Sequence, residues 1–182
     1  ESCHLPPFSP PIFVSTKTKN MKQSKTIIFI PGLFVNNTSW KEWKVYFEQR
    51  GYTCYTPANP YHDGSPTNLR ANIDPQLNKV GFEDVVWNIV KLIDTLPEKP
   101  IVIGHSLAGL VVQKLVELGK AAAGVSIDGA PPKNVLPPFQ TIKTVFPVVN
   151  FFKSGAFMGS KEWYHYAFFN NLTRAESDKE FE

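Results

Sequence analysis

One run of the sequence constrains the fold more than any other: PIVIGHSLAGLVVQ, Pro100 to Gln113, places a single serine between an apolar β-like segment and a helix-like segment. A serine at such a junction either caps the helix or is a nucleophile held in a tight turn. The tight turn requires small neighbours, and Gly104 and Ala108 supply them. We therefore predict a buried strand that leads directly into a helix, with Ser106 as a candidate nucleophile.

Short apolar runs alternate with segments of helical spacing through residues 21–132, which we assign to one core domain. Strands are predicted at 26–30, 53–57 and 101–104 and within AAAGVSIDGAPP, residues 121–132. Helices are predicted for three turns ending at Gly51, with Asn37, Thr38 and Ser39 as candidate N-caps, and for 82–96 and 106–119. Residues 58–80 are predicted as loop. This alternation predicts an α/β fold with a mostly parallel sheet covered by helices on both faces.

The two ends of the chain differ from this core in composition. Residues 1–20 are rich in Pro, Ser and Thr and are interpreted as a leader, with an edge strand at Ile12 to Thr16 as the alternative. Residues 133–182 are rich in aromatic residues and are predicted to form an incomplete helical lid. The final SDKEFE continues a helical pattern without a stop signal, so we expect the chain to be a fragment that lacks the last strands of its fold.

Composition excludes several function classes. The formal net charge of +3 arises from 19 basic and 16 acidic residues scattered along 182 positions, which disfavours a nucleic-acid partner. Every apolar run is interrupted before it reaches the length of a membrane span. The two cysteines have no metal-binding spacing, and Cys54 is expected to be buried in a strand. We draw no localisation from the sequence beyond a slight preference for the cytoplasm.

The segments IIFIPG, PIVIGHSLAGLVVQ and VSIDGAPP, in this order, resemble the α/β-hydrolase superfamily, in particular its small bacterial-type esterases and lysophospholipase-like members. The likeness covers roughly residues 24–182. Two positions depart from the family pattern: Pro31-Gly32 stands where His-Gly is common, and Ala108 replaces the second glycine of the elbow. The resemblance implies a Ser106 nucleophile and no metal or organic cofactor. The oxyanion is expected to bind the backbone N–H groups of Leu107 and Leu33, with Phe34 as the alternative to Leu33.

The resemblance also implies an acid and then a histidine later in the chain. Asp128, at the end of a predicted strand, is either this acid or a residue that orders the following turn. The chain has four histidines. His4 is in the leader, His62 is in the early loop and His165 is in the lid. His105 is beside Ser106, and its side chain is expected to point away from the serine. None follows a final strand, although His165 is a weak candidate base. We therefore expect the acid and the histidine on a second polypeptide that completes the domain.

These features predict a hydrolase that cleaves carboxylic esters through an acyl-enzyme on Ser106. Aromatic residues of the lid predict a small apolar or aromatic ester substrate, although they also have a packing role: Phe139, Phe146, Phe151, Phe152, Phe157, Trp163, Tyr164 and Phe168. The alternatives are a lyase or cofactor-free peroxidase on the same fold, and a binding protein or receptor that has lost turnover.

Overall fold

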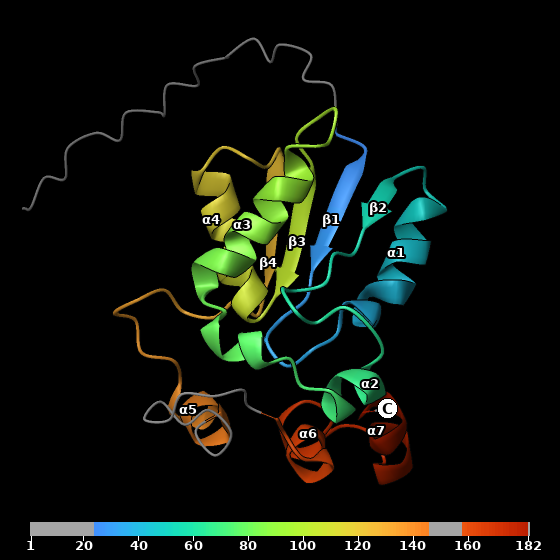
Figure 1. Cartoon of the computed structure of the whole chain (residues 1–182), viewed down its shortest axis with the longest axis vertical. Helices are drawn as coiled ribbons and strands as arrows, with labels where there is room; N and C mark the ends of the chain where they lie inside the picture. The colour runs from blue at the N-terminus through green and yellow to red at the C-terminus, as the bar shows by residue number, and fades with distance from the viewer. Residues whose placement is uncertain (1–23, 146–157, 182) are drawn as a thin grey trace, which may run out of the picture.

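Four strands form a parallel sheet in the order β2-β1-β3-β4 (Figure 1). Their bounds are β1 Thr26–Ile30, β2 Thr53–Tyr55, β3 Ile101–His105 and β4 Ala123–Ile127. The computed structural model describes residues 24–145 and 158–181, so the predicted leader and its possible edge strand lie outside the described residues. Within the described part, the predicted parallel sheet is confirmed.

Helices cover both faces of this sheet, as the alternating pattern predicts (Figure 1). Helices α3 (Phe82–Ile93) and α4 (Leu107–Glu117) pack on one face. Helix α1 (Lys41–Glu48), preceded by the 3-10 helix η1 (Asn37–Trp40), packs on the other. Because successive strand residues point to opposite faces, β1 contributes to both packing layers.

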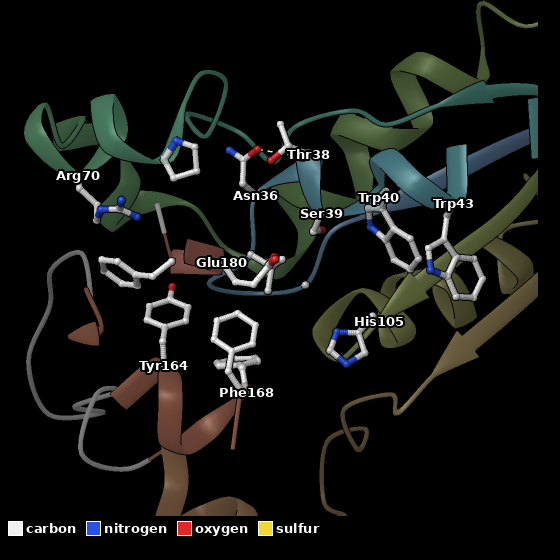
Figure 2. A pocket seen from close by; sticks show the side chains of 15 residues that line it. Asn36, Thr38, Ser39, Trp40, Trp43, Arg70, His105, Tyr164, Phe168 and Glu180 are labelled. Atoms are coloured by element: carbon white, nitrogen blue, oxygen red, sulfur yellow. Dashed lines mark hydrogen bonds between the residues drawn. The ribbon is translucent and has the colours of Figure 1, made fainter. Parts of the chain in front are cut away.

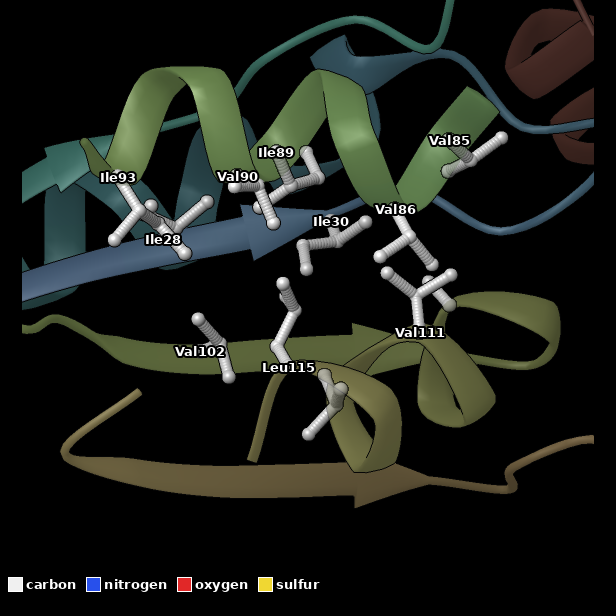
Figure 3. Packing of buried hydrophobic residues seen from close by; sticks show 12 residues of the cluster. Ile28, Ile30, Val85, Val86, Ile89, Val90, Ile93, Val102, Val111 and Leu115 are labelled. Carbon is white, nitrogen blue, oxygen red and sulfur yellow. The ribbon is translucent and has the colours of Figure 1, made fainter. Parts of the chain in front are cut away.

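The layer beneath α3 and α4 is the larger of the two (Figure 3). It consists of fully or almost fully buried aliphatic side chains that interdigitate between the sheet and the two helices: Ile28, Ile30, Val86, Ile89, Val102, Val111 and Leu115. Burial of so many branched side chains accounts for most of the hydrophobic stabilisation of the described fold.

The layer beneath α1 is smaller and more aromatic. Phe29 stacks on Trp40 with ring centroids 5.2 Å apart, and Phe47 packs 5.8 Å from Phe29. Cys54 of β2 is buried here, as predicted, and burial raises the pKa of its thiol.

Two local predictions differ from the structure. The cap at the first helical segment is Asn36, whose side chain accepts from the Thr38 N–H, one residue before the predicted candidates. The predicted loop at 58–80 contains helix α2 (Pro66–Ala71) and the 3-10 helix η2 (Pro75–Lys79). Each is capped by the side chain that precedes its proline, Ser65 and Asp74. A polar N-cap followed by proline is a helix-start signal, which explains why these proline-rich residues are not all loop.

Three further helices lie beyond the carboxyl ends of the strands (Figure 1). They are α5 (Phe139–Val145), α6 (Lys161–Ala167) and α7 (Arg174–Phe181), here called the cap helices. Arg174 at the start of α7 pairs with Glu162 of α6 at 3.0 Å. Active sites of open parallel sheets form at the carboxyl ends of the strands, so the cap helices lie on the side where a site is expected. Among the described residues, no helix is long and apolar enough to cross a membrane.

Candidate active site

Ser106 occupies the turn between β3 and α4 in a backbone conformation that L-residues rarely adopt. Its φ is 58° and its ψ is −123°. Its hydroxyl does not cap α4 and makes no hydrogen bond with the described residues. A serine that served as a helix cap would have extended backbone angles and a side chain bonded to the first turn. The geometry therefore argues against the capping alternative, and it matches the strained strand-to-helix turn of a nucleophile elbow.

Backbone hydrogen bonds hold this strained turn from both sides. The Ser106 N–H donates to the Ile127 carbonyl at the end of β4 at 3.0 Å. The Ser106 carbonyl accepts from the N–H groups of Gly109 and Ala130, each at 2.9 Å. A conformation that costs of the order of 1–3 kcal/mol persists where its surroundings impose it. The end of β4 and the first turn of α4 impose it here.

Close packing around the turn explains the small residues of the motif. A Cβ at Gly104 would lie 2.7 Å from the Ala108 carbonyl carbon, a distance that real Cβ atoms do not reach. A Cβ at Gly109 would collide with Gly129 and with the Ser126 hydroxyl of β4. The elbow therefore requires glycine at 104 and 109, and Ala108 is small enough for the motif to keep its geometry.

The loop that follows β1 lies directly against the elbow. A Cβ at Gly32 would lie 3.3 Å from the Ser106 Cβ and 3.0 Å from the His105 carbonyl oxygen. Leu33 and Phe34 form the turn that follows, and Phe34 has a φ of 68°. We call Pro31 to Phe34 the oxyanion loop, because its backbone is adjacent to Ser106, as the predicted donor role of Leu33 or Phe34 requires. Leu107 opens α4 on the other side of the serine, where the first N–H groups of a helix have no intrahelical acceptor.

Two cavities flank this arrangement. The larger has a volume of about 440 Å³ and lies between the oxyanion loop, α2 and the cap helices (Figure 2). Its lining combines aromatic rings with polar and charged side chains, and includes Gly32, Asn36, Arg70, His105, Tyr164, Phe168 and Glu180. The smaller cavity, of about 160 Å³, is lined by Leu33, Leu107, Asn59 and His62 among others. The two candidate oxyanion residues thus share the lining of the smaller cavity.

Comparison with known proteins agrees with this geometry. Residues 27–179 match the model of the Alpha/beta hydrolase family. This chain belongs to the alpha/beta hydrolase family. No curated protein matches the sequence.

Solved structures of similar fold include an extracellular alpha/beta-hydrolase from a Paenibacillus species. It is 20% identical, with a TM-score of 0.67, over 86% of this chain and 64% of that chain. Tomato methylketone synthase I is 15% identical, with a TM-score of 0.60, over 87% of this chain and 65% of that chain. Polyneuridine aldehyde esterase is 15% identical, with a TM-score of 0.57, over 87% of this chain and 67% of that chain. These similarities establish the fold, and this chain spans less than two thirds of the length of the first of these proteins.

Asp128, the candidate acid, directly follows β4. Its backbone has a φ of 44° and it is exposed. Its carboxylate makes no hydrogen bond or ion pair with the described residues. Asp128 therefore directly follows Ile127, whose carbonyl accepts the hydrogen bond from the Ser106 N–H. None of the histidines among the described residues is hydrogen-bonded to Asp128.

The three described histidines occupy separate places. His105 lies on the same face of β3 as Ile103, and its ring lines the larger cavity (Figure 2). The Nδ1 of His62 lies 3.0 Å from the Pro60 carbonyl, so Nδ1 carries the proton, since a carbonyl only accepts. His165 is in α6, and its buried Nδ1 has no partner among the described residues. None of the three makes a described contact with the Ser106 hydroxyl. His4 lies outside the described residues.

The structure also identifies residues that the sequence pattern did not single out. Phe169 and Phe181 join the predicted Tyr164 and Phe168 in the lining of the larger cavity. Asn59, in the predicted loop, donates to the Pro31 carbonyl at 3.4 Å and to the Gly32 carbonyl at 3.5 Å. No local sequence pattern predicts the cavity lining or the hydrogen bonds from Asn59, because both join segments that are far apart in the chain. Of the predicted lid aromatics, Phe146, Phe151, Phe152 and Phe157 lie outside the described residues, and Phe139 is 78% exposed.

No group of three or more His, Cys, Asp or Glu side chains in the described ranges is arranged to hold a metal ion. The groups that are in place are a serine hydroxyl and backbone N–H donors.

Proposed function

We propose that this protein is a serine hydrolase that cleaves carboxylic esters, with Ser106 as its nucleophile. The observation that carries the proposal is the backbone of Ser106, with φ 58° and ψ −123°, together with a hydroxyl that takes no part in capping α4. A protein that used this serine only for structure would gain nothing from such a conformation, which costs free energy. In an ester hydrolase the same conformation presents the hydroxyl beside helix N–H donors.

The proposed reaction follows from the groups around the serine. Ser106 Oγ attacks the ester carbonyl while a histidine accepts its proton, and the N–H groups of Leu107 and Leu33 bind the oxyanion. Collapse of this intermediate breaks the ester C–O bond, and the histidine returns the proton to the leaving alcohol. Water then attacks the acyl-enzyme by the same route and releases the carboxylic acid. Phe34 is the alternative second donor.

The larger cavity supports a small apolar or aromatic ester as substrate. It is bounded by the aromatic rings of the cap helices on one side and by Trp40 and Trp43 on the other (Figure 2). Its volume of about 440 Å³ is in the range of small-molecule pockets. Gly32 in its lining brings the oxyanion loop to the edge of this space.

The histidine and acid of this mechanism are proposed to lie on a second polypeptide that completes the domain. One observation supports this part of the proposal. Among the described strands, β4 pairs with β3 only, and its Val125 is 45% exposed, which is unusual for an apolar residue in a parallel sheet.

Covalent labelling with a fluorophosphonate probe tests the nucleophile in the protein as purified from its source, including any companion chain. We expect labelling of the wild type, no labelling of Ser106→Ala, and unchanged labelling of Ser24→Ala. Ser24 is the control, because it precedes β1 at the amino end of the strand and lines neither cavity. Intact mass under denaturing conditions identifies the companion polypeptide.

Failure of the probe to label a sample that contains the completing segment would overturn the hydrolase proposal and favour a binding protein. Product analysis separates the remaining enzymatic alternatives. A hydrolase releases one carboxylic acid for each ester consumed, whereas a lyase or a peroxidase does not.

A further inference from the structure

The turn of the oxyanion loop is an unusual piece of backbone. Phe34 has a φ of 68°, a left-handed conformation that glycine adopts readily and a bulky residue adopts rarely. Such a turn persists where contacts from elsewhere hold it. The contacts that hold Phe34 come from the cap helices.

The first contact is a hydrogen bond between segments 130 residues apart. The Tyr164 hydroxyl of α6 donates to the Phe34 carbonyl oxygen at 2.6 Å. Burial raises the pKa of the Tyr164 phenol, so the group remains protonated and able to donate throughout the neutral range. This bond fixes the peptide that follows Phe34, in the same turn as the Leu33 N–H.

The second contact is aromatic. The ring of Phe34 packs edge-on against the ring of Trp163, with an interplanar angle of 72° and centroids 5.1 Å apart. The Trp163 indole N–H in turn donates to the Thr144 carbonyl of α5 at 2.9 Å. Trp163 and Tyr164, which are adjacent in α6, therefore both contact the turn, and Trp163 links it to a second cap helix, α5.

Tyr164 is itself held in place from several directions. Its ring stacks on Phe168 with centroids 5.5 Å apart and meets Phe181 of α7 at 5.2 Å. The side chain of Ser160 caps α6 by accepting from the Trp163 N–H. A side chain with so little freedom can fix the position of the atom to which it donates (Figure 2).

From this geometry we infer that Tyr164 is a positioning residue for catalysis: it holds the oxyanion loop from the cap, so that the cap helices set the placement of the backbone donor at Leu33. The inference rests on the proposed function, since it concerns the oxyanion of the same ester hydrolysis. Tyr164 lines the larger cavity as well, but the role assigned to it acts through the loop and not through contact with the reacting atoms.

Tyr164→Phe tests this role, because it keeps the ring and removes only the hydroxyl. The matched control is Tyr166→Phe on the same helix, whose hydroxyl contacts only the Gln140 side chain at 3.5 Å. Activity toward p-nitrophenyl butyrate is measured with the intact protein, and kcat is expressed per Ser106 titrated with fluorophosphonate, so that unfolded chains do not count.

For Tyr164→Phe we expect kcat to fall about 10- to 100-fold with KM within about twofold, since a misplaced donor weakens the transition state more than the ground state. Affinity for a trifluoromethyl ketone, which forms an oxyanion on the serine, should fall by a similar factor. Tyr166→Phe should match the wild type in all three quantities. Phe34→Gly, which adopts the turn without strain, should reduce the effect of the Tyr164 change to less than about threefold.

The inference is overturned if kcat per titrated site is unchanged in Tyr164→Phe, or if KM rises while kcat does not change. Either result in an active wild type leaves the proposed function intact. A wild type that neither reacts with fluorophosphonate nor hydrolyses the ester overturns the proposed function instead.

Discussion

The two sides of the sheet differ in how completely they are covered. The side beneath α3 and α4 is a closed layer, in which Val86, Val111 and Leu115 are fully buried. The opposite side is closed only over β1 and β2, where α1 packs, while β4 is exposed along four of its five residues. The comparison shows that the described residues form one fully covered hydrophobic layer and one partly covered layer. Strand β3 contributes side chains to both layers, and Ser106 directly follows this strand.

The largest expected effect is on the closed side. Leu115→Ala should lower the free energy of unfolding by about 3 kcal/mol, because it leaves a cavity in a layer that cannot collapse. In the absence of the proposed companion polypeptide, Val125→Ala on β4 should cost under about 1 kcal/mol, because nearly half of this side chain is exposed in this chain. Urea unfolding of the two variants measures both values. A higher cost of Val125→Ala in the protein as purified from its source would show that the companion covers β4.

A smaller difference in the free energy of unfolding is expected between alanine substitutions of two glycines, one in β3 and one in β4. Gly104→Ala should cost about 2 kcal/mol, since the added methyl meets the backbone of α4 at Ala108. Gly124→Ala places its methyl 2.8 Å from the side-chain ends of Val112, which is buried, and Val116, which is 47% exposed. Its cost should be about 1 kcal/mol, below that of Gly104→Ala, because the added methyl meets side-chain ends and not backbone. Thermal unfolding of both variants tests this order, and a costlier Gly124→Ala would contradict the idea that β4 is the looser strand.

The smallest expected effect is a difference in stability between two substitutions of Ser106, which follows the strand shared by both layers. Ser106→Gly should be more stable than Ser106→Ala by about 1 kcal/mol, because glycine adopts a φ of 58° without steric strain. Both variants should lose fluorophosphonate labelling. Chemical unfolding of the pair compares them directly, and equal stability would mean that the surrounding hydrogen bonds, and not strain relief, dominate at this position.

Local signals account for the parts of the fold that were predicted. The elbow was visible because a β-branched run, small residues around a serine and a helical apolar pattern follow one another within 14 residues. The helices at 66–71 and 75–79 were missed although their signal was local. Ser65-Pro66 and Asp74-Pro75 are helix starts, but the density of Pro and Gly in residues 58–80 led to a prediction of loop.

Non-local contacts account for what could not be predicted. The oxyanion loop was placed beside Ser106 by family resemblance, whereas its contact with Tyr164 joins residues 34 and 164 and has no pattern in the sequence. The same holds for the cavity, whose lining combines Gly32, Arg70 and Phe181 from three separate segments. Aromatic composition predicted that the cap is apolar, but not which rings face the site.

The sequence by itself determined the parallel sheet, the helices on both faces and the strained serine between β3 and α4, because these depend on periodicity, small residues and turn chemistry within short windows. Only the tertiary structure decided how Gly32 meets the elbow, how the end of β4 holds the Ser106 backbone, and how α6 reaches the Phe34 carbonyl. Those contacts depend on the packing of segments that are distant in the chain, and packing is fixed by the shape of the whole core and not by any local pattern.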